Sequence, residues 1–98
     1  MNIEISPKEY ERQLKWDDAN MYCQLLSIDG KNDWRLPTID ELNDMHESEL
    51  DFDGIEYWSS TEYDNKTFWF QDLKSGYSHC TYPIVIFHVR PVRTMVKE

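Results

Sequence analysis

Hydrophobic and polar residues alternate just before Pro37, and their spacing changes just after it. Trp34 and Leu36 flank Arg35 in an extended stretch, so both apolar side chains are expected to point into a core. Pro37 favours an extended conformation at Leu36, so no helix should cross this point. Arg35 then points to the opposite side. There its five donors can organise buried polar groups, or it lies on the surface of a half-exposed strand.

A helix is predicted to begin after Thr38. Thr38 can act as the N-cap, and Glu41, three residues further on, can close a capping box. Ile39, Leu42 and Met45 follow at helical spacing and would form the buried side. The predicted helix therefore runs from about residue 39 to residue 45.

Another helix is predicted upstream, over residues 17–27. Its apolar positions recur at spacings of three and four, and they are Trp16, Ala19, Tyr22 or Cys23, Leu25 and Leu26. Gly30 is expected to end this helix in the left-handed conformation. Before it, residues 3–5 alternate as a short strand, and Ser6 is expected to open a capping box and a single turn over residues 6–9.

The second half of the chain predicts strands. Residues 47–56 show no period and are expected to form a loop, whereas strand formers are concentrated in residues 57–61, 68–70, 77–82 and 84–90. Gly76 provides a turn for a hairpin, and Pro83 leaves one edge of it exposed. Because both helices precede most of the sheet, the fold class is α+β. The last strand is expected to lie centrally, with residues 3–5 paired to it so that the two ends of the chain meet.

Composition and charge limit the classes of partner that this chain can bind. The 98 residues are enough for a single domain with its own core. The net charge is −9, and residues 36–65 contain ten acidic residues and no Lys or Arg. This argues against nucleic acid and against an anionic membrane as a partner; the acidic block favours solubility, a cation or a basic protein surface.

Targeting signals and cysteines bear on location. The first four residues lack the basic start and apolar run of a signal peptide, and no segment has the length of a membrane span, so a cytoplasmic location is expected. Cys23 and Cys80 are then expected to be reduced thiols, with Cys23 in the core and Cys80 in a strand. A disulfide between them is left open by the sequence.

Four motifs occur in order along the chain. They are Trp16-x-x-Ala19-x-x-Tyr22-Cys23, Asp33-Trp34-Arg35-Leu36-Pro37-Thr38-x-x-Glu41-Leu42, Tyr57-Trp58-Ser59-Ser60-Thr61 and Val89-Arg90-Pro91-Val92-Arg93. This combination resembles the Lcl C-terminal domain family of bacteria and phages, a domain of unknown function. The resemblance makes residues 1–98 a single domain of this kind.

The resemblance implies a C-type-lectin-like fold with two helices and a small curled antiparallel sheet. The Arg-Leu-Pro-Thr-x-x-Glu block is also similar, more distantly, to the formylglycine-generating enzyme fold. Better-studied members of the family are surface adhesins that bind sulfated polysaccharides. This chain departs from them because it is acidic and lacks the Lys and Arg clusters that sulfate groups require.

The motif residues are interpreted as scaffold rather than as chemistry. They are Trp16, Ala19, Trp34, Arg35, Leu36, Pro37, Thr38, Glu41, Trp58, Ser59, Ser60, Arg90 and Arg93. The three arginines could share buried carboxylates such as Glu41. Glu49, Asp51 and Asp53 resemble the start of a calcium loop, but Ser60 stands where that loop needs a bidentate Glu. With no nucleophile–base pair and no zinc-ligand spacing, neither an enzyme nor a cofactor is predicted.

Loop residues remain as candidates for binding. They are Tyr63, Asp64, Asn65, Lys66, Tyr77, Ser78 and Tyr82, which combine tyrosines with small polar groups. We therefore expect a small non-enzymatic module that binds a protein or glycan through loops, as a monomer or homodimer. The alternative is an acidic decoy or inhibitor that uses residues 40–64 against a basic protein surface.

Overall fold

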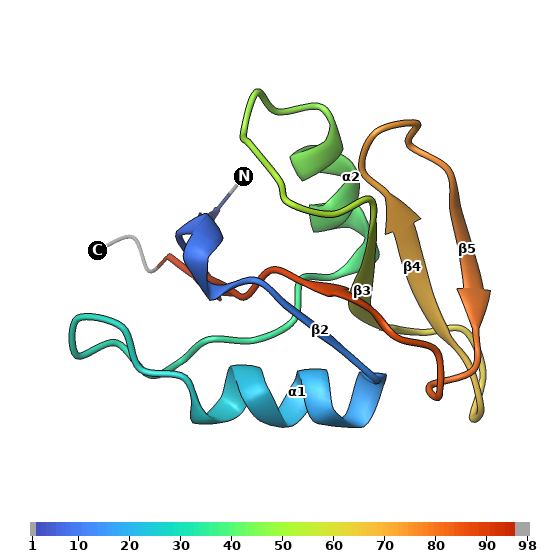
Figure 1. The fold of residues 1–98 in the computed structure, drawn as a ribbon, viewed down its shortest axis with the longest axis horizontal. Coiled ribbons are helices and arrows are strands. Elements are labelled where there is room, and N and C mark those ends of the chain that lie inside the picture. The colour runs from blue at the N-terminus through green and yellow to red at the C-terminus, as the bar shows by residue number, and fades with distance from the viewer. Residues whose placement is uncertain (1, 96–98) are drawn as a thin grey trace.

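The computed structural model describes residues 2–95 and has an α+β fold, as predicted (Figure 1). Two α-helices precede most of the strands, and a short 3₁₀ turn (Lys8–Tyr10) lies near the N-terminus. The elements in chain order are β1 (Ile3–Ile5), β2 (Arg12–Leu14), α1 (Trp16–Leu25), α2 (Ile39–His46), β3 (Glu56–Glu62), β4 (Phe68–Asp72), β5 (Ser78–Thr81), β6 (Phe87–Val89) and β7 (Val92–Thr94).

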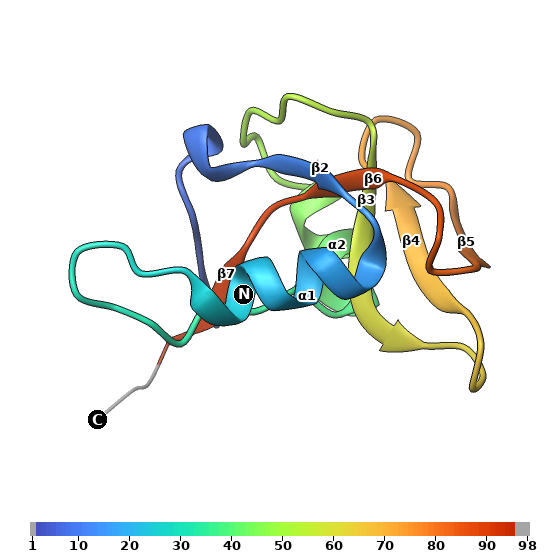
Figure 2. The same ribbon diagram turned by 60° about the horizontal axis from the view of Figure 1, so that its bottom comes forward.

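The strands form two sheets. The larger sheet has the order β2-β6-β3-β4-β5, and the smaller one pairs β1 with β7. Ile3 lies opposite Thr94, so the two ends of the described chain are adjacent, as predicted (Figure 2). All pairs are antiparallel except β3 with β6, which meet in parallel where Tyr57 faces His88. This parallel contact and strand β2 were not predicted.

Helix α1 packs on one part of the core through small side chains. Ala19 and Cys23 are fully buried there, beside Leu36, Trp58 and Val89. The helix is shorter than predicted, because Leu26 already has an extended backbone. Leu25 is 77% exposed, so its assignment to the apolar face was wrong.

Helix α2 has the predicted start. The Thr38 hydroxyl accepts the Glu41 amide at 3.1 Å, and a Glu41 carboxylate oxygen accepts the Thr38 amide at 2.9 Å. Two orphan N–H groups are therefore satisfied by one reciprocal pair. Leu42 and Met45 are fully buried in the second part of the core, against Tyr57.

Two turn predictions need correction. Gly30 has a positive φ of 80° as expected, but it does not end α1. It follows Asp29, with φ of 52°, in a two-residue turn closed by a reciprocal pair of backbone hydrogen bonds between Ile28 and Lys31. Such turns need positive φ at both central residues, which Asp-Gly provides. The Ser6 hydroxyl does not cap a helix either; it donates to the Pro91 carbonyl at 2.8 Å, because this segment stays beside β7.

The segment predicted as one long strand over residues 84–90 forms a strand only at β6. The chain turns before it, where the Val85 amide donates to the Tyr82 carbonyl and the Trp16 amide donates to the Pro83 carbonyl. Pro83 has no N–H to donate to a neighbouring strand, so a turn forms here despite the high β propensity of the segment. The part that pairs in the larger sheet, β6, is interior to it, as expected for a central strand. Residues 3–5 do not pair with this strand, as was predicted for the last strand, but with β7 in the smaller sheet.

Candidate functional site

The predicted binding residues lie at two opposite ends of the β4–β5 hairpin. Residues 63–66 connect β3 to β4, and Tyr82 follows β5 at the same end, since Phe68 pairs with Thr81. Tyr77 and Ser78 lie at the other end, where the chain leaves the Gly76 turn. The strand β5 separates the two groups, so the structure does not unite the seven residues in one site (Figure 1).

The loop between β3 and β4 is built by Asp64. One of its carboxylate oxygens accepts the backbone amides of Lys66 and Thr67 and the Thr67 hydroxyl, at 2.8 to 2.9 Å. The Lys66 amide is the main cause of the lowered pKa of Asp64. Asp64 therefore holds the loop in shape. Tyr63 lies beside it, 60% exposed, and its ring makes a T-shaped contact with the ring of Trp69.

A second group of exposed side chains adjoins this end of the sheet and was missed from the sequence. Tyr82, Ile84 and Ile86 are 60%, 73% and 58% exposed, whereas the residues between them are half-buried. Residues 82–87 are all apolar, so the sequence itself shows no hydrophobic–polar alternation, and most of this run was interpreted as paired strand. The exposure of every second residue is seen only in the structure.

The motif arginines form three separate clusters instead of sharing one carboxylate. Arg35 makes a bidentate pair with Glu41, at 2.7 and 2.9 Å, and this guanidinium is the main cause of the lowered pKa of Glu41. Arg93 contacts Asp33 at 2.6 Å and Glu4 at 3.0 Å near the surface. Arg35 thus braces the capping box of α2, and Arg93 ties β7 to its neighbours. These contacts agree with the interpretation of both arginines as scaffold residues.

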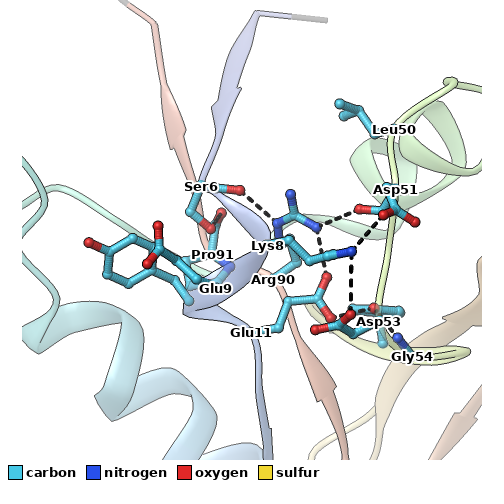
Figure 3. A network of polar contacts seen from close by, with 12 residues as sticks. Ser6, Lys8, Glu9, Glu11, Leu50, Asp51, Asp53, Gly54, Arg90 and Pro91 are labelled. Carbon is cyan, nitrogen blue, oxygen red and sulfur yellow. Dashed lines mark hydrogen bonds and ion pairs between the residues drawn. The ribbon is translucent and has the colours of Figure 1, made fainter.

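Arg90 takes part in a buried network. Its side chain and that of Glu11 are both about 5% exposed or less, and the two groups meet at 2.7 Å. The other oxygen of Glu11 accepts the Tyr57 hydroxyl at 2.6 Å, and that hydroxyl accepts the Gly54 amide at 2.8 Å. Arg90 also donates to the Ser6 carbonyl (Figure 3). Burial, followed by the Glu11 carboxylate, raises the pKa of Tyr57, so the phenol remains a hydrogen-bond donor.

The candidate calcium loop is part of the same network. Asp51 accepts a hydrogen bond from the Lys8 ammonium at 2.6 Å, and Asp53 lies 3.6 Å from the same nitrogen (Figure 3). The Asp51 carbonyl accepts from Arg90. Within residues 2–95 no three His, Cys, Asp or Glu side chains are grouped so that they could hold a metal ion. The cation that these two carboxylates contact is therefore Lys8.

A polar cavity of about 410 Å³ lies beside the network. Its lining residues are Glu11, Arg12, Gln13, Asp53 and His88. His88 lies directly over Gly54, where a Cβ atom would come within 2.2 to 2.4 Å of the imidazole. Gln13 and His88 are paired across β2 and β6, so the sheet itself positions one wall.

The tryptophans of the motifs lie in or against the core. Trp34 and Trp58 are buried, whereas Trp16 is half-buried and stacks on Phe68 with ring centroids 3.7 Å apart. Cys23 is buried and Cys80 lies in β5, and both are free thiols, so the disulfide left open by the sequence is absent from the structure. Among the described residues, no helix is long and apolar enough to cross a membrane.

The fold and its motif clusters define a small α+β domain held together by arginine–carboxylate pairs, with its ends joined by β1 and β7. The family model of the Lcl C-terminal domain matches residues 4–93, so the chain belongs to this family. A comparison with curated proteins found no match.

Proposed function

We propose that this chain is a non-enzymatic binding module that recognises a protein partner. The proposed contact is the apolar surface formed by Tyr63, Tyr82, Ile84 and Ile86. These side chains come from the β3–β4 loop and from the segment after β5, at one end of the larger sheet. Exposed apolar side chains gathered in this way are typical of protein interaction sites.

The observation that carries the proposal is the exposure of three large apolar side chains within an uncharged stretch. Charged residues make up 30% of the chain, yet residues 75–89 contain no Asp, Glu, Lys or Arg. Tyr82, Ile84 and Ile86 lie in this stretch and each exposes more than half of its surface. Aromatic and aliphatic anchors without competing charge are the usual centre of a protein interface.

The same composition favours a protein over a sulfated glycan. A sulfated polysaccharide needs several Lys or Arg side chains that converge on its sulfate groups. Lys66 is the basic residue of the β3–β4 loop, and the apolar surface itself is uncharged. A protein partner with an apolar patch of its own fits these side chains better.

Affinity capture with matched variants tests the proposal. The wild-type chain, Ile84→Asp and Leu25→Asp are immobilised and exposed to lysate of the organism that encodes the chain. Leu25 lies on α1, away from the apolar surface, and is as exposed as Ile84, so it controls for the added charge. We expect a protein retained by wild type and Leu25→Asp and lost with Ile84→Asp. Retention that is equal for the two Asp variants would refute the proposed surface.

A decoy function through residues 40–64 is the second candidate. The exposed acids of this block that support it are Asp40, Asp44, Glu47, Glu49, Glu56 and Glu62. Glu41, Asp51 and Asp53 are already engaged by Arg35 and Lys8. Asp64 is exposed too, but its carboxylate is bonded within the β3–β4 loop. A salt titration of the captured complex separates the two functions, because contacts between exposed charges weaken steeply with salt and apolar contacts do not.

A further inference from the structure

We propose that strand β5 pairs in antiparallel fashion with β5 of a second copy of this chain, so that the two larger sheets join at their edges. Within the described residues, β5 is the outermost strand of its sheet and pairs on one side only, with β4. This inference goes beyond the proposed function, because it concerns the backbone edge of β5 and not the side chains of the apolar surface.

The register of the sheet shows which backbone groups face outward. The Tyr77 carbonyl accepts the Asp72 amide across the hairpin, so residues 77, 79 and 81 direct their N–H and C=O groups to β4. The Trp69 carbonyl, opposite Cys80, turns the other way and accepts the Ser59 hydroxyl. Ser78 and Cys80 therefore present their N–H and C=O groups at the free edge.

The charge distribution favours a second copy as the occupant of this edge. The chain carries a net charge of −9, so most of its surface repels an identical molecule. Residues 75–89, which include all of β5, carry no charged side chain. Exposed edge strands are commonly protected by a charge such as Lys, and β5 has none. A two-fold contact brings the uncharged β5 edges of the two copies together, so no like charges meet at the contact.

One side chain now occupies the edge. The Cys80 amide donates to the His79 Nδ1 at 2.8 Å, and the Cys80 carbonyl lies 3.0 Å from the same nitrogen. Because His79 is exposed, its ring can rotate into solvent and release both groups. Pairing with a second β5 then replaces these local contacts by intermolecular backbone hydrogen bonds. His79 is thus a competitor of self-association, and its removal should strengthen the dimer.

Molar mass in solution is the primary test. Light scattering on wild type is expected to give twice the 11.9 kDa of one chain at high concentration and to approach 11.9 kDa on dilution. Cys80→Pro removes an outward N–H without touching the β4–β5 ladder, and should raise the dissociation constant at least about tenfold, whereas Cys80→Ser should not. His79→Ala should lower it. Moderate salt should lower the dissociation constant of the dimer, because it screens the repulsion between the negatively charged surfaces of the two copies.

Crosslinking keeps the inference testable if Cys80→Pro fails to fold. Cys80 is partly exposed and Cys23 is buried, so a short bis-maleimide reports on Cys80. If the two-fold axis passes through Cys80, the two Cys80 residues face each other and wild type should give a crosslinked dimer. If it passes through His79, residue 78 of one copy faces residue 80 of the other, and Ser78→Cys should give the crosslinked dimer. Either product supports the inference, with Cys80→Ser as the negative control.

Two results would overturn the inference. One is a mass of 11.9 kDa for wild type up to millimolar concentration, with no crosslinked product from either protein. The other is a dimer that survives Cys80→Pro and dissociates with Ile84→Asp, which would move the contact to the apolar surface. The first result leaves recognition of another protein intact, so it can be told apart from failure of the proposed function.

Discussion

Arg90 and Glu11 lie 79 positions apart in the sequence and form a buried ion pair, with 2.7 Å between the guanidinium nitrogen and the carboxylate oxygen. The pair is closed on the other side of Glu11 by the Tyr57 hydroxyl. Since Arg90 also donates to carbonyls of Ser6 and Asp51, one arginine connects the N-terminal segment, the loop before β3 and the last strands (Figure 3).

Removal of Glu11 should be costly. Glu11→Ala leaves the Arg90 charge buried without its partner, and such a change typically lowers the free energy of unfolding by about 3–5 kcal/mol. Asp51→Asn is the control: the contact of Asp51 with Lys8 is also short, at 2.6 Å, but the Lys8 and Asp51 side chains are 41% and 82% exposed. Solvent screens such an exposed pair, so its loss should change the free energy of unfolding far less than the loss of Glu11.

Urea unfolding followed by tryptophan fluorescence measures both variants. A loss for Glu11→Ala no larger than that for Asp51→Asn would show that the buried network does not hold the fold together. The double variant Glu11→Ala with Arg90→Met should recover part of the loss, because it removes the unpaired charge as well as the pair.

Glu41 should give the fold a pH dependence of definite sign. Hydrogen bonding to Arg35 lowers the pKa of Glu41 below its ordinary value of 4.5. The folded state therefore binds a proton less readily than the unfolded state, and the stabilisation is fully present above pH 4.5. It is lost as the pH falls below that value and through the lowered pKa.

The pH dependence is measured as the free energy of unfolding between neutral pH and pH 3. Glu41→Gln should be less stable than wild type at neutral pH and should lose less on acidification. Glu49→Gln is the control, because Glu49 is exposed and makes no ion pair within residues 2–95. Parallel curves for wild type and Glu41→Gln would contradict the role given to the Arg35–Glu41 pair.

Gly54 should tolerate no side chain while His88 is present. A Cβ at this position would lie 2.2 to 2.4 Å from the His88 ring, and overpacking of this kind costs about 1–3 kcal/mol. In the background His88→Ala, the penalty of Gly54→Ala should largely disappear. Thermal unfolding of the four proteins gives the coupling between the two positions.

Gly30→Ala separates steric from conformational effects. No atom lies within 4 Å of a Cβ at Gly30, but the residue has a φ of 80°. Its substitution should cost about 1–2 kcal/mol through the backbone alone. That cost should be the same with and without His88→Ala; a rescue of both glycine variants would point to a general effect of the histidine.

The parts of the fold that could be predicted are those set by neighbours in sequence. Thr38 and Glu41 are three residues apart, and their capping box forms as expected. Gly76 closes the predicted hairpin with a φ of 84°. In each case the groups that form the element lie within a few residues of one another, so the sequence pattern is enough to predict it.

The parts that could not be predicted depend on distant partners. Nothing in the sequence around Glu11 distinguishes it from a surface carboxylate, because its partners Tyr57 and Arg90 are distant in the chain. The residues around Ile84 have strong β propensity, but the chain turns there at Pro83, whose carbonyl accepts the Trp16 amide. The segment predicted as a paired strand therefore exposes Ile84 and Ile86 instead. Propensity is a property of the segment, whereas pairing depends on the strand that lies beside it.

The two cysteines should differ sharply in reactivity. Cys23 lies on the buried face of α1, and burial raises the pKa of its thiol to about 12, whereas Cys80 lies in β5 and is partly exposed. The thiolate is the reactive form, so iodoacetamide at pH 8 should modify one thiol per native chain. Peptide mapping should locate the label at Cys80. Modification of Cys23 should appear only when urea unfolds the chain, at the same urea midpoint that tryptophan fluorescence gives for unfolding.

The two cysteines should also differ in their effect on stability. Cys23→Ser buries a hydroxyl in an apolar site and should lower the free energy of unfolding by about 1–3 kcal/mol, whereas Cys80→Ser should lower it by well under 1 kcal/mol. Rapid labelling of Cys23 in the native protein would mean that α1 opens locally, and the core beneath Ala19 and Trp58 would then be less firmly closed than its packing indicates.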